Sequence, residues 1–289
     1  MMTSQPRISH LLRRLRKKRY WPFLLLLGLA ILYFVFPPPH TDILVLGIDG
    51  RAGEGWAARA DSIMLVGIEP RSLGVSMMSI PRDLSVEVPW YGLQRVNTVN
   101  MLGEMEDGNT GPALMKAAVA QSFGVTPERY VRLNFSGFVG LVDAVGGVTI
   151  DVTHPIVDYN YPTEDFGVKT VEFEIGVQHM DGERALIYAR TRYADDDYRR
   201  AERQQQVVSA LLGRMINPLA WPAVAGVLSQ SVDTDLSAWD LLTLAPAVLI
   251  GGGRADRLVI DRDLITATAE GVAVPDYEQL APWVQAHFD

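Results

Sequence analysis

Five arginines crowd into fourteen residues of this chain: Arg190, Arg192, Arg199, Arg200 and Arg203. A guanidinium group presents a planar fork of N–H donors that can match two phosphate oxygens at once. The stretch therefore predicts a phosphate or pyrophosphate site. The alternatives are an internal ion-pair network with the three aspartates at positions 195–197, or charge at the rim of a helix end.

The residues after Asp197 predict the helix that would turn some of these arginines inward. Apolar residues recur along it at helical spacing: Val207, Val208, Leu211, Leu212 and Met215. Counting back in turns places Arg200, Arg203 and Gln204 on the same face, and Arg199 on the opposite one. Arginine is rarely buried without a partner, so the inward pair indicates a bound anion or a set of acidic partners.

A second group of charged residues lies at the ends of three predicted strands. The strands are expected at residues 43–48, 62–68 and 74–80. Their connections are too short for parallel crossovers, so we expect an antiparallel meander. The end of the first strand, the start of the second and the end of the third then share one sheet edge. That edge gathers Asp49, Arg51, Arg59, Asp61, Arg82 and Asp83. The alternative is a set of surface turn charges paired with one another in salt bridges.

Asp49 and Asp61 are the candidate metal ligands of that edge. The chain has no cysteine, and its five histidines lack the spacing of a zinc site. Two carboxylates without nitrogen or sulfur ligands favour Mg²⁺ or Mn²⁺. Together with the arginines they predict a diphosphate bridged to the metal. The matching chemistry is phosphoryl transfer, which depends mainly on positioning and on neutralising charge.

Charge is divided unevenly along the 289 residues, whose formal net charge is −8. Seven basic residues and no acidic one precede Asp42, and the remainder carries 19 basic against 34 acidic residues. Such an acidic remainder should repel nucleic acid. We expect a basic cytoplasmic tail at 1–19, a transmembrane helix at 20–36, a proline spacer at 37–41 and an extracytoplasmic domain at 42–289. A cleaved signal peptide is the alternative to this single-pass anchor in the cell membrane.

Within the exported domain, strand and helix patterns alternate, which predicts a layered α/β fold. Helices are expected at 112–123, 137–145 and 181–190, capped in the last two cases by Ser136 and Asp181. Strands are expected at 130–133 and 148–152, and a hairpin loop within 151–174. Two more helices should follow at 218–227 and 237–249. Five apolar residues of the first read as packing or as the wall of an apolar cavity: Leu219, Trp221, Val224, Val227 and Leu228.

Eight short segments, taken in order, resemble the LytR-CpsA-Psr family of cell-wall proteins. They are VLGID at 45–49, RADS at 59–62, SIPRD at 79–83, RVN at 95–97, VRLNFSGF at 131–138, VDAVGGV at 142–148, DGERALIYARTR at 181–192 and DYRRAERQ at 197–204. The resemblance covers about residues 40–215 and rests on the order and spacing of the segments. Two positions depart from the family's usual pattern: Arg199 stands where glycine is common, and Ala60 where serine is common.

The resemblance implies a three-layer α/β/α domain with a mixed central sheet and an apolar groove for a polyprenyl chain. It also implies a Mg²⁺-dependent phosphotransferase, which moves a glycan phosphate from a polyprenyl-pyrophosphate-linked glycopolymer to a peptidoglycan hydroxyl. By position, Asp49 and Asp61 match the metal-side aspartates. The residues matching the pyrophosphate side are Arg59, Arg82, Arg190, Arg192, Arg200, Arg203 and Gln204.

Neither argument identifies a convincing general base. Asp83 is the candidate that could take the proton of the acceptor hydroxyl, and a turn carboxylate paired with Arg82 is the competing interpretation. Two other functions stay open at this point. One is a hydrolase that cleaves the polyprenyl pyrophosphate, and the other is a non-catalytic envelope protein that binds lipid-linked glycan and regulates.

Overall fold

The computed structural model describes residues 8–49, 55–163, 167–191 and 197–288, and divides the chain into two units, Met1–Pro39 and His40–Asp289. In the first unit, helix α1 covers Ile8–Val35, so it begins inside the expected basic tail and contains most of the expected membrane segment. In the described part of the chain, no helix has both the length and the apolar character that crossing a membrane requires. The anchor at 20–36 therefore stays a prediction.

A six-stranded mixed sheet forms the centre of the second unit, in the order β11-β6-β1-β2-β3-β12. Strands β1 (Thr41–Ile48), β2 (Ala60–Glu69) and β3 (Gly74–Ser79) pair antiparallel in sequence, which confirms the expected meander. Strand β6 (Arg129–Leu133) lies parallel to β1, and β12 (Asp256–Val259) parallel to β3. The short strand β11 (Val232–Thr234) closes the other edge against β6.

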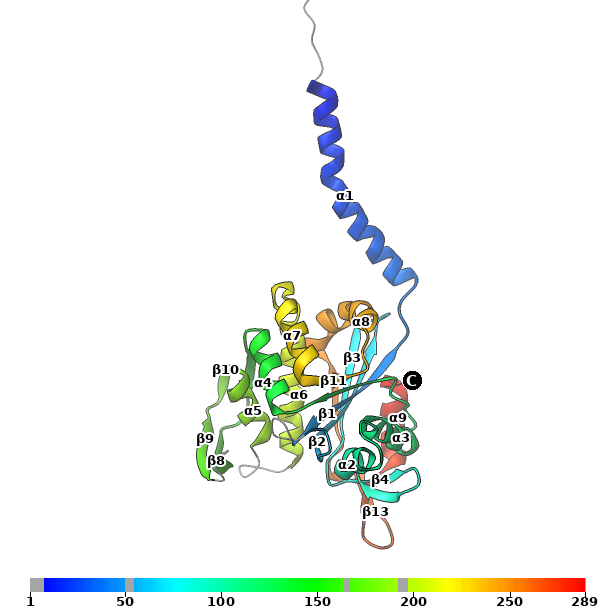
Figure 1. Ribbon diagram of the computed structural model, residues 1–289, viewed down its shortest axis with the longest axis vertical. Coiled ribbons are helices and arrows are strands. Elements are labelled where there is room, and N and C mark those ends of the chain that lie inside the picture. The colour runs from blue at the N-terminus through cyan, green and yellow to red at the C-terminus, as the bar shows by residue number, and fades with distance from the viewer. Residues whose placement is uncertain (1–7, 50–54, 164–166, 192–196, 289) are drawn as a thin grey trace, which may run out of the picture. The chain divides into compact units, whose positions relative to one another are not determined.

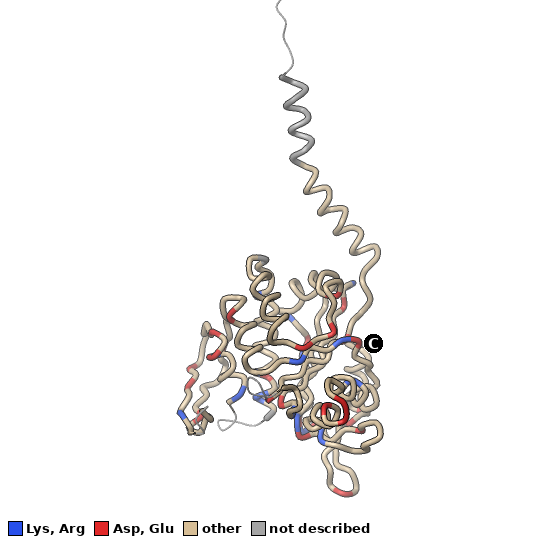
Figure 2. The backbone as a smooth tube through the Cα atoms, viewed as in Figure 1, with Lys and Arg blue, Asp and Glu red and all other residues tan. Residues whose placement is uncertain are grey.

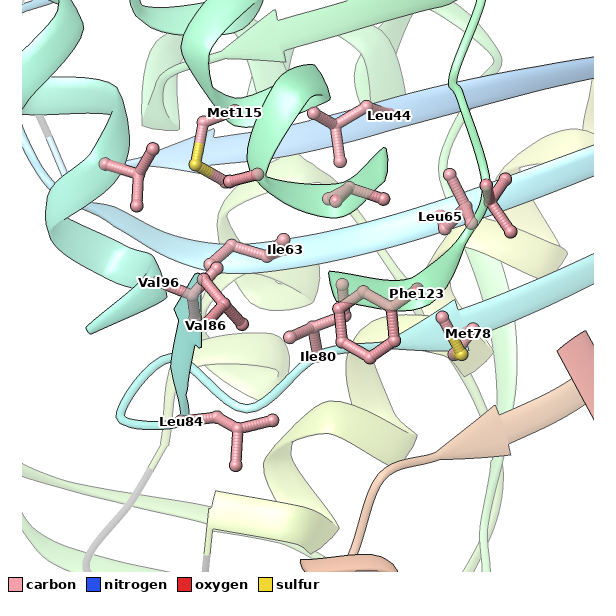
Figure 3. Close-up of a cluster of buried hydrophobic side chains, with 14 of the residues drawn as sticks. Leu44, Ile63, Leu65, Met78, Ile80, Leu84, Val86, Val96, Met115 and Phe123 are labelled. Carbon is pink, nitrogen blue, oxygen red and sulfur yellow. The ribbon is translucent and has the colours of Figure 1, made fainter. Parts of the chain in front are cut away.

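Helices cover both faces of this sheet because the inner strands are apolar on both sides (Figure 1). On one face, Leu44, Ile63 and Met78 pack against α2 (Val96–Glu106), α3 (Gly111–Phe123) and α9 (Tyr277–His287). Figure 3 shows Met115 and Phe123 of α3 over these strands. On the other face, the intervening strand residues pack against α6 (Asp197–Arg214) and α8 (Ala238–Gly251). The expected three-layer arrangement is thus present.

A second, smaller group of elements lies beside the sheet and contributes residues to the candidate site described below. It consists of α4 (Phe135–Ala144), α5 (Gly182–Arg190) and two paired sets of strands, β7 (Val148–Val152) with β10 (Gly176–Met180) and β8 (Ile156–Pro162) with β9 (Val168–Phe173). The β8–β9 pair is the hairpin expected within 151–174. Helix α4 starts two residues earlier than expected, because Asn134 rather than Ser136 caps it by accepting from the Gly137 N–H. Asp181 caps α5 as expected.

The remaining elements complete the outside of the domain. Helix α7 covers Trp221–Ser231 and follows a 3₁₀ turn at Pro218–Ala220, so the regular helix starts later than the sequence indicates. Two small hairpins join β4 (Ser85–Val88) with β5 (Gly92–Arg95), and β13 (Ile265–Ala267) with β14 (Ala273–Pro275). Gly251 at the end of α8 packs on the β2–β3 turn, where an added Cβ would clash with the Leu73 carbonyl oxygen.

Candidate functional site

A β-bulge at the end of β1 and the start of β2 sets the position of the two candidate metal ligands. Gly47 pairs with Ser62, but Ile48 pairs with Ala60, so Asp61 is the extra residue of β2. Such a bulge re-aims a side chain at a sheet edge. The Asp49 N–H donates to the Arg59 carbonyl at 3.2 Å, which closes the intervening loop and brings Asp49 next to the start of β2. Basic and acidic positions meet at this end of the sheet in Figure 2.

A polar cavity of about 530 Å³ opens at this edge. It is lined by Asp49, Arg59, Asp61, Arg82, Asp83, Arg95, Asn97 and Thr98. The structure therefore brings together the described members of the predicted charged edge. The sequence did not single out Arg95, Asn97 and Thr98 as site residues, although the first two lie within a segment of the family resemblance.

Ion pairs link several charges of the polar cavity. Arg82 Nη1 donates to Asp61 Oδ2 at 3.2 Å, and its Nε lies 3.5 Å from Asp83 Oδ2. Arg95 Nη1 is 4.0 Å from the other oxygen of Asp83. The paired turn carboxylate, which was the competing interpretation of Asp83, is thus present in the structure. Asp49 and Arg59 are both exposed.

A second cavity, of about 300 Å³, lies on the other side of the two aspartates and is mainly apolar. Phe135 and Phe138 of α4, Leu186 of α5 and Val208 of α6 contribute to its wall. None of the five apolar residues expected from 219–228 lines it. Val224 instead packs with Val145 and Ala220, so the packing interpretation holds for this residue and the wall comes from α4. Asp49 and Asp61 line both cavities.

Three predicted residues from α5 and α6 reach the apolar cavity: Arg190, Arg200 and Gln204. The guanidinium carbon of Arg190 lies 3.9 Å from the centre of the Phe135 ring, and its Nη1 donates to the Tyr161 hydroxyl at 3.4 Å. Burial raises the pKa of this tyrosine, and the neighbouring arginine opposes the shift. Arg200 is 7% exposed. Gln204 accepts from the Ser62 hydroxyl at 2.9 Å, which ties α6 to β2 beside Asp61.

Arg203 occupies a different position from the other predicted arginines. It is 4% exposed, and it donates from Nε to the Tyr188 carbonyl at 2.9 Å and from Nη2 to the Thr191 carbonyl at 2.7 Å. It lines neither cavity in the described part of the chain. These bonds give it a positioning role, because they hold the end of α5 against α6. Its predicted contact with pyrophosphate stays a prediction.

Some predicted residues lie outside the described part of the chain: Arg51, Arg192, Asp195 and Asp196. The flanking Thr191 is described and fully buried, and its hydroxyl donates to Asp158. This aspartate, which also lines the apolar cavity, is a site residue that the sequence argument missed. It lies within the irregular stretch at 151–174, which gave no periodic signal that could have distinguished it.

Comparison with known proteins decides the family. Residues 39–263 match the LytR_cpsA_psr family. The chain belongs to the LytR-CpsA-Psr family. It is 32% identical over 209 residues to the polyisoprenyl-teichoic acid–peptidoglycan teichoic acid transferase TagU of Oceanobacillus iheyensis, a match covering 71% of this chain and 61% of TagU. It is also 32% identical over 201 residues to the regulatory protein MsrR of Staphylococcus aureus, covering 68% of this chain and 56% of MsrR.

Matches to these curated LytR-CpsA-Psr relatives therefore span little more than half of their length. The fold agrees with a solved member of the family. The crystal structure of Bacillus subtilis TagV has a TM-score of 0.65 and 25% identity, over 86% of this chain and 96% of that one.

The two residues that depart from the LytR-CpsA-Psr pattern line neither cavity. Ala60 is fully buried in the core beneath the sheet edge, and Arg199 is exposed on α6. The helix count had placed Arg199 on the solvent side, and the structure confirms that orientation. Neither substitution removes a side chain from the lining of the site.

Proposed function

We propose that this protein transfers a glycan phosphate from a polyprenyl-pyrophosphate-linked glycopolymer to a hydroxyl group of peptidoglycan. One observation carries the proposal: Asp49 and Asp61 line both an apolar cavity and a polar one. A lipid-linked glycan diphosphate would fit these two cavities, because it has an apolar chain on one side of the phosphates and a polar sugar on the other. The similarity to TagU, a teichoic acid transferase, supports the same class of reaction.

In the proposed reaction, the acceptor hydroxyl oxygen attacks the phosphorus that carries the glycan. A new O–P bond forms, the bond to the bridging oxygen of the diphosphate breaks, and polyprenyl phosphate leaves. Arg59, Arg82, Arg190 and Arg200 line the cavities on both sides of the shared aspartates, where they can neutralise charge on the phosphates. Asp83, 51% exposed and held by two arginines, is the carboxylate proposed to take the hydroxyl proton.

A Mg²⁺ or Mn²⁺ ion belongs to this proposal. The residues fit a hard cation in part: Asp49 and Asp61 offer carboxylate oxygens at one place. Among the described residues, no cluster of three or more acidic, histidine or cysteine side chains could hold an ion. Mg²⁺ commonly takes one or two carboxylates and completes its shell with phosphate oxygens and water, so two aspartates suffice. When bound, the ion would neutralise charge on the diphosphate.

The proposal includes the membrane arrangement expected from the sequence. The basic residues before position 20 would keep the N-terminus cytoplasmic, and the apolar run at 20–36 would anchor the chain as a single pass. The domain from residue 42 would then face the cell envelope, where peptidoglycan and the lipid-linked glycopolymer meet.

The test uses the full chain in detergent with lipid-linked glycopolymer, a peptidoglycan acceptor and Mg²⁺. Arg200→Ala should lower the transfer rate by about 10²-fold, because it removes a charge at the lipid side of the diphosphate. Arg199→Ala, the exposed neighbour on the same helix, is the matched control and should keep wild-type activity. A mass spectrum of lipid extracted from the purified protein should contain a polyprenyl diphosphate.

The same assay separates the alternatives. Release of phosphorylated glycan without attachment to the acceptor would identify a hydrolase. Tight binding of the lipid-linked glycan without turnover, with or without Mg²⁺, would favour a binding and regulatory role. The test includes this last alternative because the MsrR relative is named a regulatory protein.

A further inference from the structure

Two asparagines on α2 differ in one respect that concerns the polar cavity. Asn97 and Asn100 lie three residues apart, so they share a face of the helix, and both are buried, with 6% and 0% of their surface exposed. Asn100 is fully used by the protein. Its Nδ2 donates to the Trp56 and Ala58 carbonyls at 2.9 and 2.8 Å, and its Oδ1 accepts from Arg132 at 3.0 Å.

Asn97 has no such partners. Within the described residues, its side-chain oxygen is buried and accepts no hydrogen bond. Its backbone N–H is satisfied by the Arg82 carbonyl at 3.2 Å, so it is the side-chain oxygen that lacks a partner. Buried polar groups are hydrogen-bonded in the great majority of cases, and an unpaired one lowers stability. Asn97 also lines the polar cavity.

We infer that Asn97 forms a subsite for a sugar hydroxyl at the α2 side of the polar cavity, an inference that rests on the proposed function. A hydroxyl group both donates and accepts, so it can bond to either half of a carboxamide. A half-turn about the terminal torsion of asparagine exchanges Oδ1 with Nδ2 without moving the helix. The hydroxyl therefore completes Asn97 in either orientation.

The charges of the cavity favour a neutral ligand at this position. Three guanidinium groups, from Arg59, Arg82 and Arg95, share the lining with the carboxylates of Asp49, Asp61 and Asp83. The lining is thus balanced in formal charge, and a polyhydroxylated sugar adds none. Thr98 lies on the same wall and donates its own hydroxyl to the Arg95 carbonyl at 2.7 Å, which leaves its oxygen as a second acceptor for the sugar.

The sugar could belong to the acceptor glycan or to the glycan of the lipid-linked donor, which have the same chemistry. Three probes titrated into the full chain in detergent separate these sources: a soluble peptidoglycan oligosaccharide, the lipid-linked glycopolymer and a sugar-free polyprenyl diphosphate. Asn97→Ala should weaken binding of one of the first two on the order of tenfold. It should leave the affinity for the sugar-free diphosphate unchanged.

Thermal unfolding of the same variants distinguishes a binding role from a structural one. Asn97→Ala should keep or raise Tm, because it removes an unpaired polar group. Asn100→Ala should lower Tm by on the order of 5 °C, since it removes the side-chain donor to the Trp56 and Ala58 carbonyls and one of the acceptors of buried Arg132. The inference is overturned if both glycans bind Asn97→Ala as tightly as wild type, if the diphosphate affinity falls equally, or if Tm drops as in Asn100→Ala.

Failure of this subsite and failure of the proposed function give different results in these experiments. Glycan binding that depends on Asn97 supports the subsite even if no transfer is observed. Transfer by the wild-type chain, with unchanged glycan affinity in Asn97→Ala, would overturn the subsite and leave the proposed function intact.

Discussion

Arg132 and Arg190 show two ways in which this fold uses a buried or half-buried guanidinium group. Arg132 on β6 is fully buried, and the surrounding elements supply all of its partners. Its Nε donates to Asp233 at 3.0 Å, its Nη1 to Asn100 and Glu104, and its Nη2 to Asn109 at 3.0 Å. The charge is therefore neutralised within the protein, and nothing in this arrangement invites a ligand.

Arg190 at the end of α5 has a different environment. In the described part of the chain it makes one hydrogen bond, the long one to the Tyr161 hydroxyl, and otherwise stacks on the Phe135 ring. An aromatic face attracts a guanidinium group, but it carries no formal charge that could neutralise it. The comparison indicates that an anion can bind at Arg190, whose neighbours orient the guanidinium group without neutralising its charge, and not at Arg132.

Replacing Arg132 with alanine should give the largest effect and would sharpen this comparison. The change leaves Glu104 and Asp233 without their cation, and Glu104 is itself 7% exposed. Breaking a buried pair in this way costs about 3–5 kcal/mol. We expect a fall in the free energy of unfolding of that size by urea denaturation. A double change, Arg132→Met with Glu104→Met, should recover part of the loss. If the single change unfolds at the wild-type urea concentration, Arg132 is not the structural arginine of this comparison.

Replacing Arg190 with alanine should have the opposite profile. Transfer should fall by about 10²-fold, on the order of 3 kcal/mol in the activation barrier, while Tm stays close to wild type. Arg184→Ala is the matched control, because Arg184 lies on the same helix, also stacks on a phenylalanine ring at 3.9 Å, and lines neither cavity. Equal losses of activity in the two variants would remove the distinction drawn here.

The sequence predicted which charged residues meet at the sheet edge, but not which arginines are paired within the protein and which can bind a ligand. Hydrophobic runs and short connections identified the meander, and the meander alone brought Asp49, Asp61 and Arg82 together. Helical periodicity correctly turned Arg200 and Gln204 inward. It turned Arg203 inward as well, but could not show that its N–H groups would donate to the backbone carbonyls of Tyr188 in α5 and of Thr191 just after it.

Contacts between distant segments explain what the sequence could not show. Arg132 occurs in a segment used for the family resemblance, yet its partners come from α2, the α2–α3 loop and β11, up to about one hundred residues away. The wall of the apolar cavity likewise comes in part from α4 and not from 219–228, because residues of α7 pack on Gly137 and Gly140 of α4 and line no part of the cavity. Periodicity reveals which face is apolar, but it does not reveal which neighbour covers that face.

A smaller effect is expected from Tyr161→Phe, which removes the one hydrogen bond that orients Arg190. Burial raises the pKa of this tyrosine, so its hydroxyl stays protonated across the usual assay range. The stacking on Phe135 remains, and we expect transfer to fall only about fivefold, on the order of 1 kcal/mol. A pH profile with the same shape as wild type should accompany that loss. If the transfer rate fell as far as in Arg190→Ala, the Tyr161 hydroxyl, rather than the Phe135 ring, would be what holds Arg190 in place.

The smallest effect concerns Asp240, a surface carboxylate paired with an arginine outside the site. The hydrogen bond from Arg129 Nε at 2.9 Å, followed by the bonds from the Ser237 hydroxyl and backbone N–H at the start of α8, lowers the pKa of Asp240 to about 2. Because the folded-state pKa lies below the unfolded value near 3.9, this pair stabilises the fold fully above about pH 4. That stabilisation is lost as the pH falls toward 2.

Asp240→Asn should therefore lower the free energy of unfolding at pH 7 by no more than about 1 kcal/mol, since solvent screens a pair at the surface. The difference between wild type and variant should shrink when urea unfolding is repeated at pH 3. Transfer activity should be unchanged, because neither Arg129 nor Asp240 lines a cavity. A difference that persists at pH 3 would contradict this account, because it would show that asparagine at this N3 position loses the capping-box hydrogen bonds with Ser237 and that the charge of Asp240 is not what stabilises the fold.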